Sequence, residues 1–386
     1  MDALQSDRPE VTAMGFDDLD AAIDRAISEN RVVGCVVLVA QDGEIVYRRA
    51  SGYADREAGR AMQVETPFRF SSVTKPFTTM AALKLIEQGQ LSPDDSVTKH
   101  LPDFRPRLAD GTEAEITIGH LMTHTAGFDY RFQQPHGGLY EKAGVSDGLD
   151  ESDGTLGDNL ARLASVPLMA APGTEWRYSV ATDVLGAVIS AVAGKSLDLA
   201  IRDLVTDPLG LDAAFHWQAD ELAVPYRDAP GRPVRIEGVT EVPLPFTDGP
   251  GIRFDPGRIT RKTAWPSGGG GMAGRASDVL TLLETYQAGD FLPPSLREAA
   301  RQPRVAVSEE AMGPGMAFSW IGSVVKDPAA AGSGWSEGSV SWGGVYGHWW
   351  CIDFRRRRTV VSLTNTALEG LFGQYVQDVS KGAAAA

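Results

Sequence analysis

The two ends of the chain carry the hydrophobic patterns of a β-sheet with helices beside it. Apolar residues recur at helical spacing among acidic ones over residues 16–27, which predicts an amphipathic opening helix. Two β-rich runs, 32–40 and 44–51, flank Asp42-Gly43, a dipeptide favoured in tight hairpin turns. Further strand-like runs follow at 338–342, 346–354 and 359–365, before a last helix at 373–379.

The middle of the chain shows helical rather than strand periodicity. Five segments read as helices between loops rich in Gly, Pro and Asp, and the proline-rich stretch 219–266 reads as wrapped loop. No internal repeat is evident. The predicted helices cover 75–88, 118–122, 159–164, 180–193 and 197–204.

These patterns together predict an α+β fold. We expect an antiparallel sheet built from both chain ends and flanked by helices, formed by residues 1–82 together with 268–386. Residues 83–267 would form a second lobe that is mostly helical and rich in loops. The active site is expected between the two lobes.

Composition narrows the classes of function. The chain has 386 residues, 43% hydrophobic and 23% charged, so it can bury a large core without disulfides or a structural metal. Its 36 Lys and Arg against 51 Asp and Glu give a formal charge of -15. This excess of negative charge opposes polyanions, so we expect no binding to nucleic acid or to an anionic membrane.

The cysteines and the N-terminus favour a cytoplasmic protein. Cys35 and Cys351 each lie in an apolar segment, which predicts two buried free thiols rather than a disulfide framework. The first residues lack a basic region followed by an apolar one, and the longest nearly apolar run, 32–40, is far short of the roughly 20 residues that span a bilayer.

A serine and a lysine three residues apart open one of the predicted helices. Ser72 and Lys75 form S-x-x-K, and residues three apart lie on one helix face, so the hydroxyl and the amine can meet. In the first turn Ser72 would face the positive end of the helix dipole, which favours a developing alkoxide and disfavours a lysine ammonium. The alternative is a capping serine beside a surface lysine.

Two later segments offer the other groups that a serine-lysine hydrolase needs. Tyr178 follows Pro172-Gly173 and precedes an apolar helix, where its phenol would point into the cleft and exchange a proton with Ser72. The glycines of 342–348 permit close approach of a substrate, and a backbone N–H from there, with that of Ser72, would form an oxyanion hole. The alternatives are a core tyrosine and a bulged strand.

In this order the three segments resemble the family VIII carboxylesterases, β-lactamase-like serine esterases that share the fold of class C β-lactamases and DD-peptidases. The resemblance implies an acyl-enzyme on Ser72, with Lys75 and Tyr178 as the acid-base pair. It also implies that the Val345 amide joins the Ser72 amide in the oxyanion hole. Further matching segments are Leu101-Pro102-Asp103-Phe104, Leu121-Met122-Thr123-His124-Thr125-Ala126-Gly127 and Ser267-Gly268-Gly269-Gly270-Gly271-Met272.

Two departures from the β-lactamase pattern favour neutral esters. Class C β-lactamases have Y-x-N where this chain has Tyr178-Ser179-Val180, so the amide that holds a lactam side chain is missing. They have K-T-G where Trp342-Gly343-Gly344 stands, which removes the cation that receives the lactam carboxylate. An unpaired carboxylate against indole would cost about a few kcal/mol. Some esterases of this family hydrolyse cephalosporins, so weak lactamase activity stays open.

Two other motifs are weaker candidates. Ser146 lies in G-x-S-x-G, but the α/β-hydrolase elbow needs an apolar strand before it and a helix after it, and neither is predicted here. His120 and His124 are four residues apart, yet H-L-M-T-H lacks the glutamate of H-E-x-x-H and no third ligand is evident. We expect packed structural histidines, and neither a metal nor an organic cofactor is implied.

The residues around the predicted nucleophile are expected to form an apolar and aromatic pocket, because an acyl or alkyl group needs such surface. Phe128, Phe132 and Trp349 are alternatives, with core or surface packing as the rival explanation. His348 is not needed as a base, because Ser, Lys and Tyr already perform that step. The expected substrate-binding residues are Tyr130, Trp342, Gly343, Gly344, Tyr346 and His348.

The sequence therefore predicts a serine hydrolase that cleaves small, short-chain carboxylic esters through an acyl-enzyme on Ser72. Alternatives within the enzymes are a β-lactamase, a D-amino-acid peptidase or an acyltransferase. A non-catalytic binding protein on the same fold is the alternative outside them; it would be expected to lose Ser72, Lys75 or Tyr178, and this chain retains all three. The oligomeric state is not readable from the sequence.

Overall fold

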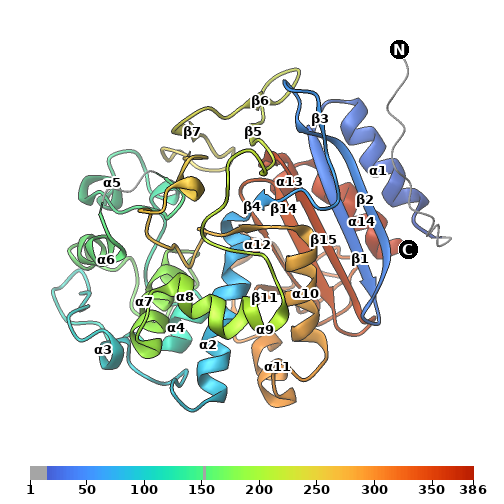
Figure 1. Ribbon diagram of the computed structural model, residues 1–386. Helices are drawn as coiled ribbons and strands as arrows, with labels where there is room; N and C mark the ends of the chain where they lie inside the picture. Colours follow the sequence, from blue (N-terminus) through green and yellow to red (C-terminus); the bar gives the residue numbers. More distant parts are fainter. Residues whose placement is uncertain (1–14, 151–153) are drawn as a thin grey trace.

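A nine-stranded antiparallel sheet organises the molecule. The computed structural model describes residues 15–150 and 154–386, and it confirms a sheet assembled from both chain ends beside a largely helical region (Figure 1). In spatial order the strands are β10 (Val305–Ala306), β11 (Met316–Phe318), β12 (Ser323–Val325), β13 (Val340–Gly344), β14 (His348–Asp353), β15 (Arg358–Thr364), β1 (Gly34–Gln41), β2 (Glu44–Asp55) and β3 (Arg60–Ala61).

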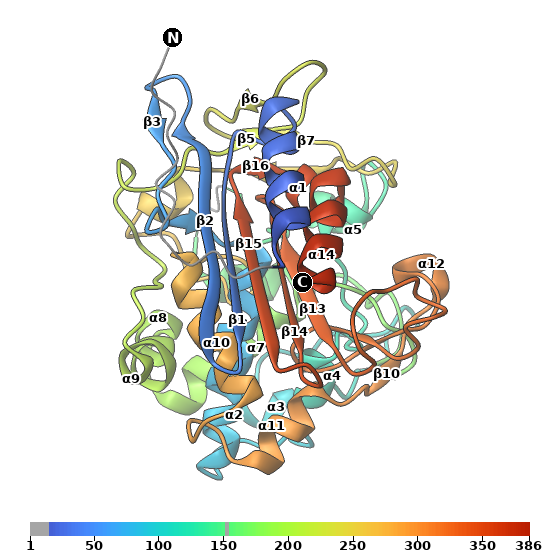
Figure 2. The same ribbon diagram turned by 90° about the vertical axis from the view of Figure 1, so that its right-hand side faces the viewer.

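Helices cover both faces of the sheet, which explains why β1 is apolar almost throughout. Helices α1 (Asp17–Ser28) and α14 (Gln374–Ala385) pack together on one face (Figure 2). Helix α10 (Ala276–Gln287) packs on β1 and β15 from the other face. Alternate β1 side chains therefore enter different cores, and a strand buried on both sides has no polar alternation.

Both cysteines belong to the core beneath α1 and α14. Cys35 and Cys351 are free and buried, as the sequence predicts. Burial raises the pKa of the Cys35 thiol to about 11. Its reactive thiolate form is therefore strongly disfavoured near neutral pH.

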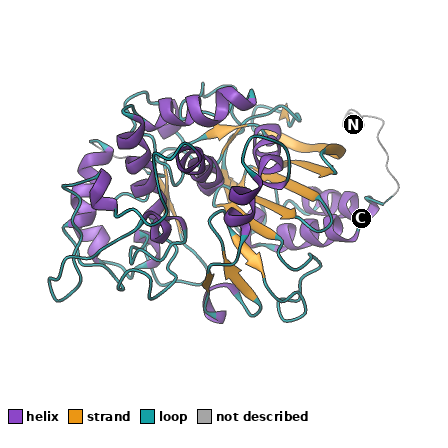
Figure 3. Ribbon diagram, turned by 90° about the horizontal axis from the view of Figure 1, so that it is seen from below, coloured by secondary structure: helices purple, strands orange, loops and turns teal. Residues whose placement is uncertain are grey.

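The helical region lies beside the sheet, as the view from below shows (Figure 3). Helix α2 (Lys75–Glu87) is buried over most of its length and packs against α7 (Ala181–Ala193), which also contacts α4 (Ile118–Met122).

No single helix among residues 15–150 and 154–386 is long and apolar enough to cross a membrane. Helix α7 and the helical segment Leu197–Leu209, which is bent away from it, pass the length and hydropathy test only when they are taken together. The other helices are α3 (Val97–His100), α4 (Ile118–Met122), α5 (Leu139–Ala143), α6 (Leu156–Ala164), α8 (Leu197–Ile201), α9 (Asp207–Leu209), α11 (Pro294–Arg301), α12 (Glu309–Met312) and α13 (Glu369–Phe372), with 3-10 turns η1 (Ser71–Thr74), η2 (Arg131–Gln133) and η4 (Arg258–Thr260) and the π-helical turn η3 (Arg202–Thr206).

The stretch 219–266 is wrapped loop only in part. It contains short strands that form two small ladders, one of which also pairs in parallel with a strand from the C-terminal region. Strands of two or three residues contain too few positions to show alternation, so the sequence pattern missed them. The short strands are β5 (Tyr226–Arg227), β6 (Val234–Arg235), β7 (Thr240–Val242), β8 (Ile252–Phe254) and β16 (Thr366–Ala367), with β4 (Phe68–Arg69) and β9 (Ala273–Gly274) elsewhere.

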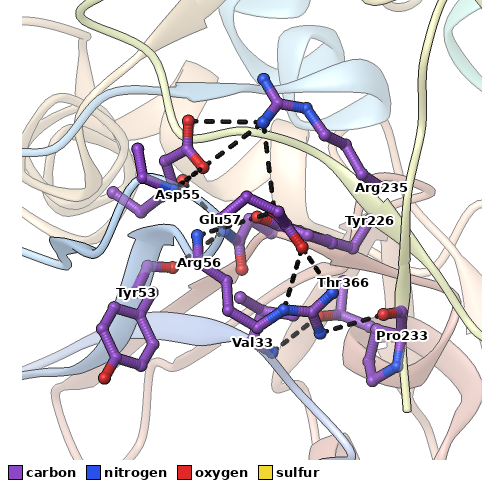
Figure 4. Close-up of polar contacts among 12 residues, drawn as sticks. Val33, Tyr53, Asp55, Arg56, Glu57, Tyr226, Pro233, Arg235 and Thr366 are labelled. Atoms are coloured by element: carbon purple, nitrogen blue, oxygen red, sulfur yellow. Dashed lines mark hydrogen bonds and ion pairs between the residues drawn. The ribbon is translucent and has the colours of Figure 1, made fainter.

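A polar network fastens this stretch to the end of β2 (Figure 4). The Tyr226 hydroxyl donates to Glu57 Oε2 at 2.5 Å and accepts from the Arg56 N–H at 2.9 Å. Arg235 Nη1 lies 3.4 Å from Asp55 Oδ1 and 4.0 Å from Glu57 Oε2. Burial and the Glu57 carboxylate raise the pKa of Tyr226 to about 12, so the phenol remains a donor at working pH.

Strand β13 lies so close to the segment before α2 that one of its positions has no room for a side chain. A Cβ atom at Gly344 would lie 2.5 Å from the Phe70 carbonyl oxygen and 2.5 Å from Ser71 Oγ. Both are distances that real Cβ atoms do not adopt. Gly344 is therefore what lets the sheet contact the turn that carries Ser72.

We predict that Gly344→Ala lowers the free energy of unfolding by about 1–3 kcal/mol, because the added methyl group forces the strand away from the turn. Urea unfolding would measure the change. Gly157→Ala is the matched control: Gly157 lies in α6 with only ordinary contacts around its Cβ position, so alanine should stabilise by about 0.5–1 kcal/mol. A Gly344→Ala protein as stable as the wild type would contradict the close packing.

Candidate active site

Ser72 lies in the tight turn that leads into α2. The turn η1 spans Ser71–Thr74, and Lys75 is the first residue of α2. Pro76 follows at the second helical position, where its missing N–H disrupts no bond. Ser72 is 7% exposed and Lys75 6%, so the hydroxyl faces a nearly dry environment in which hydrogen bonds are strong.

The structure brings the serine, the lysine and the tyrosine into one hydrogen-bonded group. The Tyr178 hydroxyl donates to Ser72 Oγ at 2.6 Å, and Lys75 Nζ donates to the same oxygen at 3.2 Å. Lys75 Nζ also donates to the Tyr130 hydroxyl at 2.9 Å and to the Gly269 carbonyl at 2.7 Å. All three protons of a lysine ammonium therefore have an acceptor.

A glycine-rich loop presents the carbonyl that Lys75 contacts. Asp183 Oδ1 accepts from Ser267 Oγ at 2.6 Å and from the Gly269 N–H at 3.2 Å, which fixes this loop against α7. A Cβ atom at Gly269 would lie 2.5 Å from Asp183 Oδ2. Burial raises the pKa of Asp183, and nearby Lys75 opposes that rise. The sequence assigns no role to Asp183 or Gly269; the run of four glycines enters only as one of the segments that match the family.

Aromatic rings surround Tyr178. Its ring centroid lies 5.0 Å from that of Tyr130, 5.0 Å from that of Trp342 and 4.9 Å from that of His124. The Trp342 indole N–H donates to the Tyr178 hydroxyl at 3.3 Å, and Lys75 Nζ lies 4.8 Å from the Tyr178 ring centroid. A hydrogen-bond donor therefore lies at the Tyr178 hydroxyl and a lysine amine lies over its ring.

The backbone N–H of Ser72 and that of Val345 have no backbone acceptor among the described residues. Across residues 15–150 and 154–386, neither the Ser72 N–H nor the Val345 N–H donates to another backbone group. The Tyr346 N–H donates to Ser71 Oγ at 3.4 Å, which holds the turn after β13 against the turn that carries Ser72. The two amides therefore belong to segments in direct contact.

The two histidines of H-L-M-T-H serve different parts of the fold. His120 Nδ1 accepts from the Thr117 N–H at 3.2 Å and so caps α4. His124 lies beneath Tyr178 and accepts from the Ser179 N–H at 3.3 Å through Nδ1. Burial, together with nearby Lys75, lowers the pKa of His124 well below its usual value. Among the residues described, no group of three metal-ligating side chains is present.

Ser146 does not have the geometry of a nucleophile elbow. Helix α5, not a strand, precedes it. Its hydroxyl donates to Asp150 and accepts from the Gly148 N–H at 3.0 Å. Asn159 holds its backbone from both sides. Its hydrogen bonds organise a buried loop.

Tyr346 and His348, which were expected in the pocket wall, lie beneath the site instead. His348 is 1% exposed and donates from Nε2 to the Arg69 carbonyl at 2.7 Å. The Tyr346 ring packs on Phe254 with centroids 4.7 Å apart. The His348 side chain links β14 to the segment before Ser72, and the Tyr346 ring packs against β8. Tyr130, Trp342, Gly343 and Gly344 lie in or directly behind the aromatic group around Tyr178.

We predict that burial of His348 makes the fold sensitive to acid. Burial lowers its pKa to about 4, so the unfolded chain takes up this proton below about pH 6.5 while the folded chain does not. The native state should therefore lose about 2–3 kcal/mol through this residue as the pH falls from 7 to 4.5. Urea unfolding of His348→Gln, which keeps a neutral donor, should show a shallower decline.

The control for this prediction is His136→Gln, because His136 is exposed. It should decline with pH as the wild type does. Equal slopes for His348→Gln and the wild type would show that His348 takes up its proton equally in both states.

Comparison with known proteins shows which family the chain belongs to. The Beta-lactamase family model matches residues 19–377. "Esterase EstB" of Burkholderia gladioli is 49% identical over 358 residues, 92% of this chain and 91% of that protein. The structure of "EstCE1, a hydrolase with promiscuous acyltransferase activity" superposes with a TM-score of 0.92 at 43% identity, covering 95% of this chain and 97% of that one. "Simvastatin Synthase (LovD) from Aspergillus terreus, unliganded" shares the fold, with a TM-score of 0.73 at 21% identity over 96% and 98% of the two chains. The chain belongs to the beta-lactamase family and, as its motifs predict, to the family VIII carboxylesterases within it.

Proposed function

We propose that this protein is a carboxylesterase that cleaves small, short-chain esters through an acyl-enzyme on Ser72. The site would lie between a sheet lobe, 1–82 with 268–386, and a helical lobe, 83–267. The observation that carries the proposal is the hydrogen-bonded group of Ser72, Lys75 and Tyr178, with Tyr178 OH 2.6 Å from Ser72 Oγ. The esterase relative, aligned over nearly its whole length, supports it.

Tyr178 is the group that removes the serine proton. Its hydroxyl is the nearest acid-base group to Ser72 Oγ, and Lys75 and Trp342 place positive charge and an N–H beside it. Ionised, it takes the proton as Ser72 attacks the ester carbonyl, then gives it to the departing alcohol oxygen. Lys75, held in place by three acceptors, is the second member of the proposed acid-base pair.

The amides of Ser72 and Val345 hold the negative oxygen of the tetrahedral intermediate. Each such donor contributes on the order of 10²- to 10³-fold to kcat when it is aimed at the oxyanion in advance. Water then attacks the acyl-enzyme along the same proton path in reverse, which releases the acid. Every step uses groups of the chain itself.

The chemistry of the walls favours neutral esters over β-lactams and D-amino-acid peptides. Trp342 stands where a β-lactamase places a lysine, and it donates to Tyr178, so it offers no cation to a substrate carboxylate. Tyr130 and Trp342 present apolar ring faces beside the nucleophile. An acyl or alkyl group gains from such a surface, whereas a carboxylate loses hydration.

Acyl transfer to an alcohol is the second candidate. The neighbour EstCE1 is described as a hydrolase with promiscuous acyltransferase activity, and an alcohol can replace water in the second step. We also propose a cytoplasmic location, because both cysteines are free and buried. The partner would be a small ester, and the -15 charge opposes binding to nucleic acid or to an anionic membrane.

A fluorophosphonate should label Ser72 and no other serine, and peptide mass mapping would locate the adduct. Ser72→Ala should abolish the label and lower turnover of p-nitrophenyl butyrate by at least about 10³-fold. Ser146→Ala is the control and should still be labelled. Label on Ser146, or nitrocefin turned over faster than the ester, would overturn this proposal.

Tyr178→Phe removes only the hydroxyl that exchanges the proton. We expect kcat for p-nitrophenyl butyrate to fall about 10²- to 10⁴-fold, with a smaller effect on KM. Tyr53→Phe, remote from the site on β2, should leave both parameters unchanged. A Tyr178→Phe enzyme with wild-type kcat would assign the proton transfer to Lys75.

A further inference from the structure

Two phenylalanine rings contact each other at the surface and remain largely exposed to solvent. Phe246 is 61% exposed and Phe372 is 46% exposed, yet their rings lie edge to face with centroids 5.1 Å apart. Large exposed apolar surface is costly in water and commonly marks a place where something binds. The segments that carry the two rings, next to β7 and in α13, both lie toward the upper end of Figure 1.

The loop that carries Phe246 is fixed to the wall of the active site. Arg131 Nη2 donates to the Gly251 carbonyl at 3.3 Å. A Cβ atom at Gly249 would lie 2.6 Å from the Phe132 carbonyl oxygen, so the loop backbone contacts the Phe132 segment directly. The Phe132 ring stacks on Tyr130 with centroids 4.8 Å apart, and Tyr130 accepts from Lys75. The loop that carries Phe246 is therefore packed against the segment that carries Tyr130 and Phe132.

Helix α13, which carries Phe372, packs against the turn between β13 and β14, which contains Val345. A Cβ atom at Gly370 would overlap the Gly347 carbonyl, and one at Gly343 would overlap Leu371. Gly347 ends the turn that contains Val345. Leu368, directly before α13, has φ +67°, a left-handed conformation that is costly for a leucine. Such strain persists only where the surrounding packing holds it, so α13 has a fixed position beside the turn.

We propose that Phe246 and Phe372 form an outer subsite that binds the apolar chain of the ester. One ring lies on the loop that packs against the Tyr130–Phe132 segment, and the other follows Leu371, which packs against Gly343 of β13, so an ester held at Ser72 would lay its chain across the two rings. The inference rests on the proposed esterase function and extends the substrates it would bind from short-chain esters to esters with longer chains. The chain would cover apolar surface on both rings that water otherwise contacts.

The test compares chain-length profiles. In the wild type, KM for p-nitrophenyl esters should fall about twofold per added methylene from hexanoate to decanoate, since the rings bury each methylene in part. In Phe246→Ser and Phe372→Ser this fall should disappear, with kcat and KM for the acetate unchanged within about twofold. Phe246→Leu, which keeps an apolar side chain, should retain most of the fall.

The matched control is Ile45→Ser, which removes an exposed apolar side chain, 48% exposed, from the opposite end of the sheet. It should show the wild-type profile. A parallel series of alkyl acetates distinguishes the two chains of an ester: a loss confined to one series identifies whether the acyl or the alcohol chain occupies the subsite.

Unchanged slopes in both serine variants would overturn the subsite while leaving the esterase intact. Failure of the wild type to turn over even the acetate would instead refute the proposed function, so the two failures are distinguishable.

Discussion

The site depends on one constraint: a lysine ammonium held inside the protein needs an acceptor for every proton. A buried cation without partners is strongly destabilising. Lys75 finds its acceptors on three separate parts of the chain, Ser72 in its own turn, Tyr130 in the helical region and Gly269 in the glycine loop. Satisfying this one group therefore draws the segments of the site together.

Glycines make that convergence sterically possible. At Gly269 any side chain would collide with Asp183, and at Gly344 it would collide with the segment before Ser72. In both places the backbone itself, rather than a side chain, contacts the nucleophile turn or its supporting loop. The conformational freedom of these glycines in the unfolded chain is a cost that the close contacts must outweigh.

The sequence predicted the sheet, the long helices and the meeting of Ser72, Lys75 and Tyr178, because each leaves a local or recognisable pattern. β1 reads as apolar and S-x-x-K reads as a helix start. Tyr346 and His348 were assigned to the pocket because their motif lies beside the predicted oxyanion hole. Strand alternation and turn geometry decide which side chains face inward. The sequence did not predict the conformation of the turn between β13 and β14, so the direction of these two side chains could not be predicted. Asp183 gave no signal, because its partner Ser267 is remote in sequence.

The arrangement separates two tasks that a single histidine performs in other serine hydrolases. Lys75 donates to three acceptors, one of them a backbone carbonyl, so its position is fixed. Tyr178 has a short contact with Ser72 Oγ, and its hydroxyl also accepts from the Trp342 N–H. In the proposed mechanism Trp342 would act on both chemistry and selectivity, since its N–H donates to the Tyr178 hydroxyl from the position where a β-lactamase has a lysine.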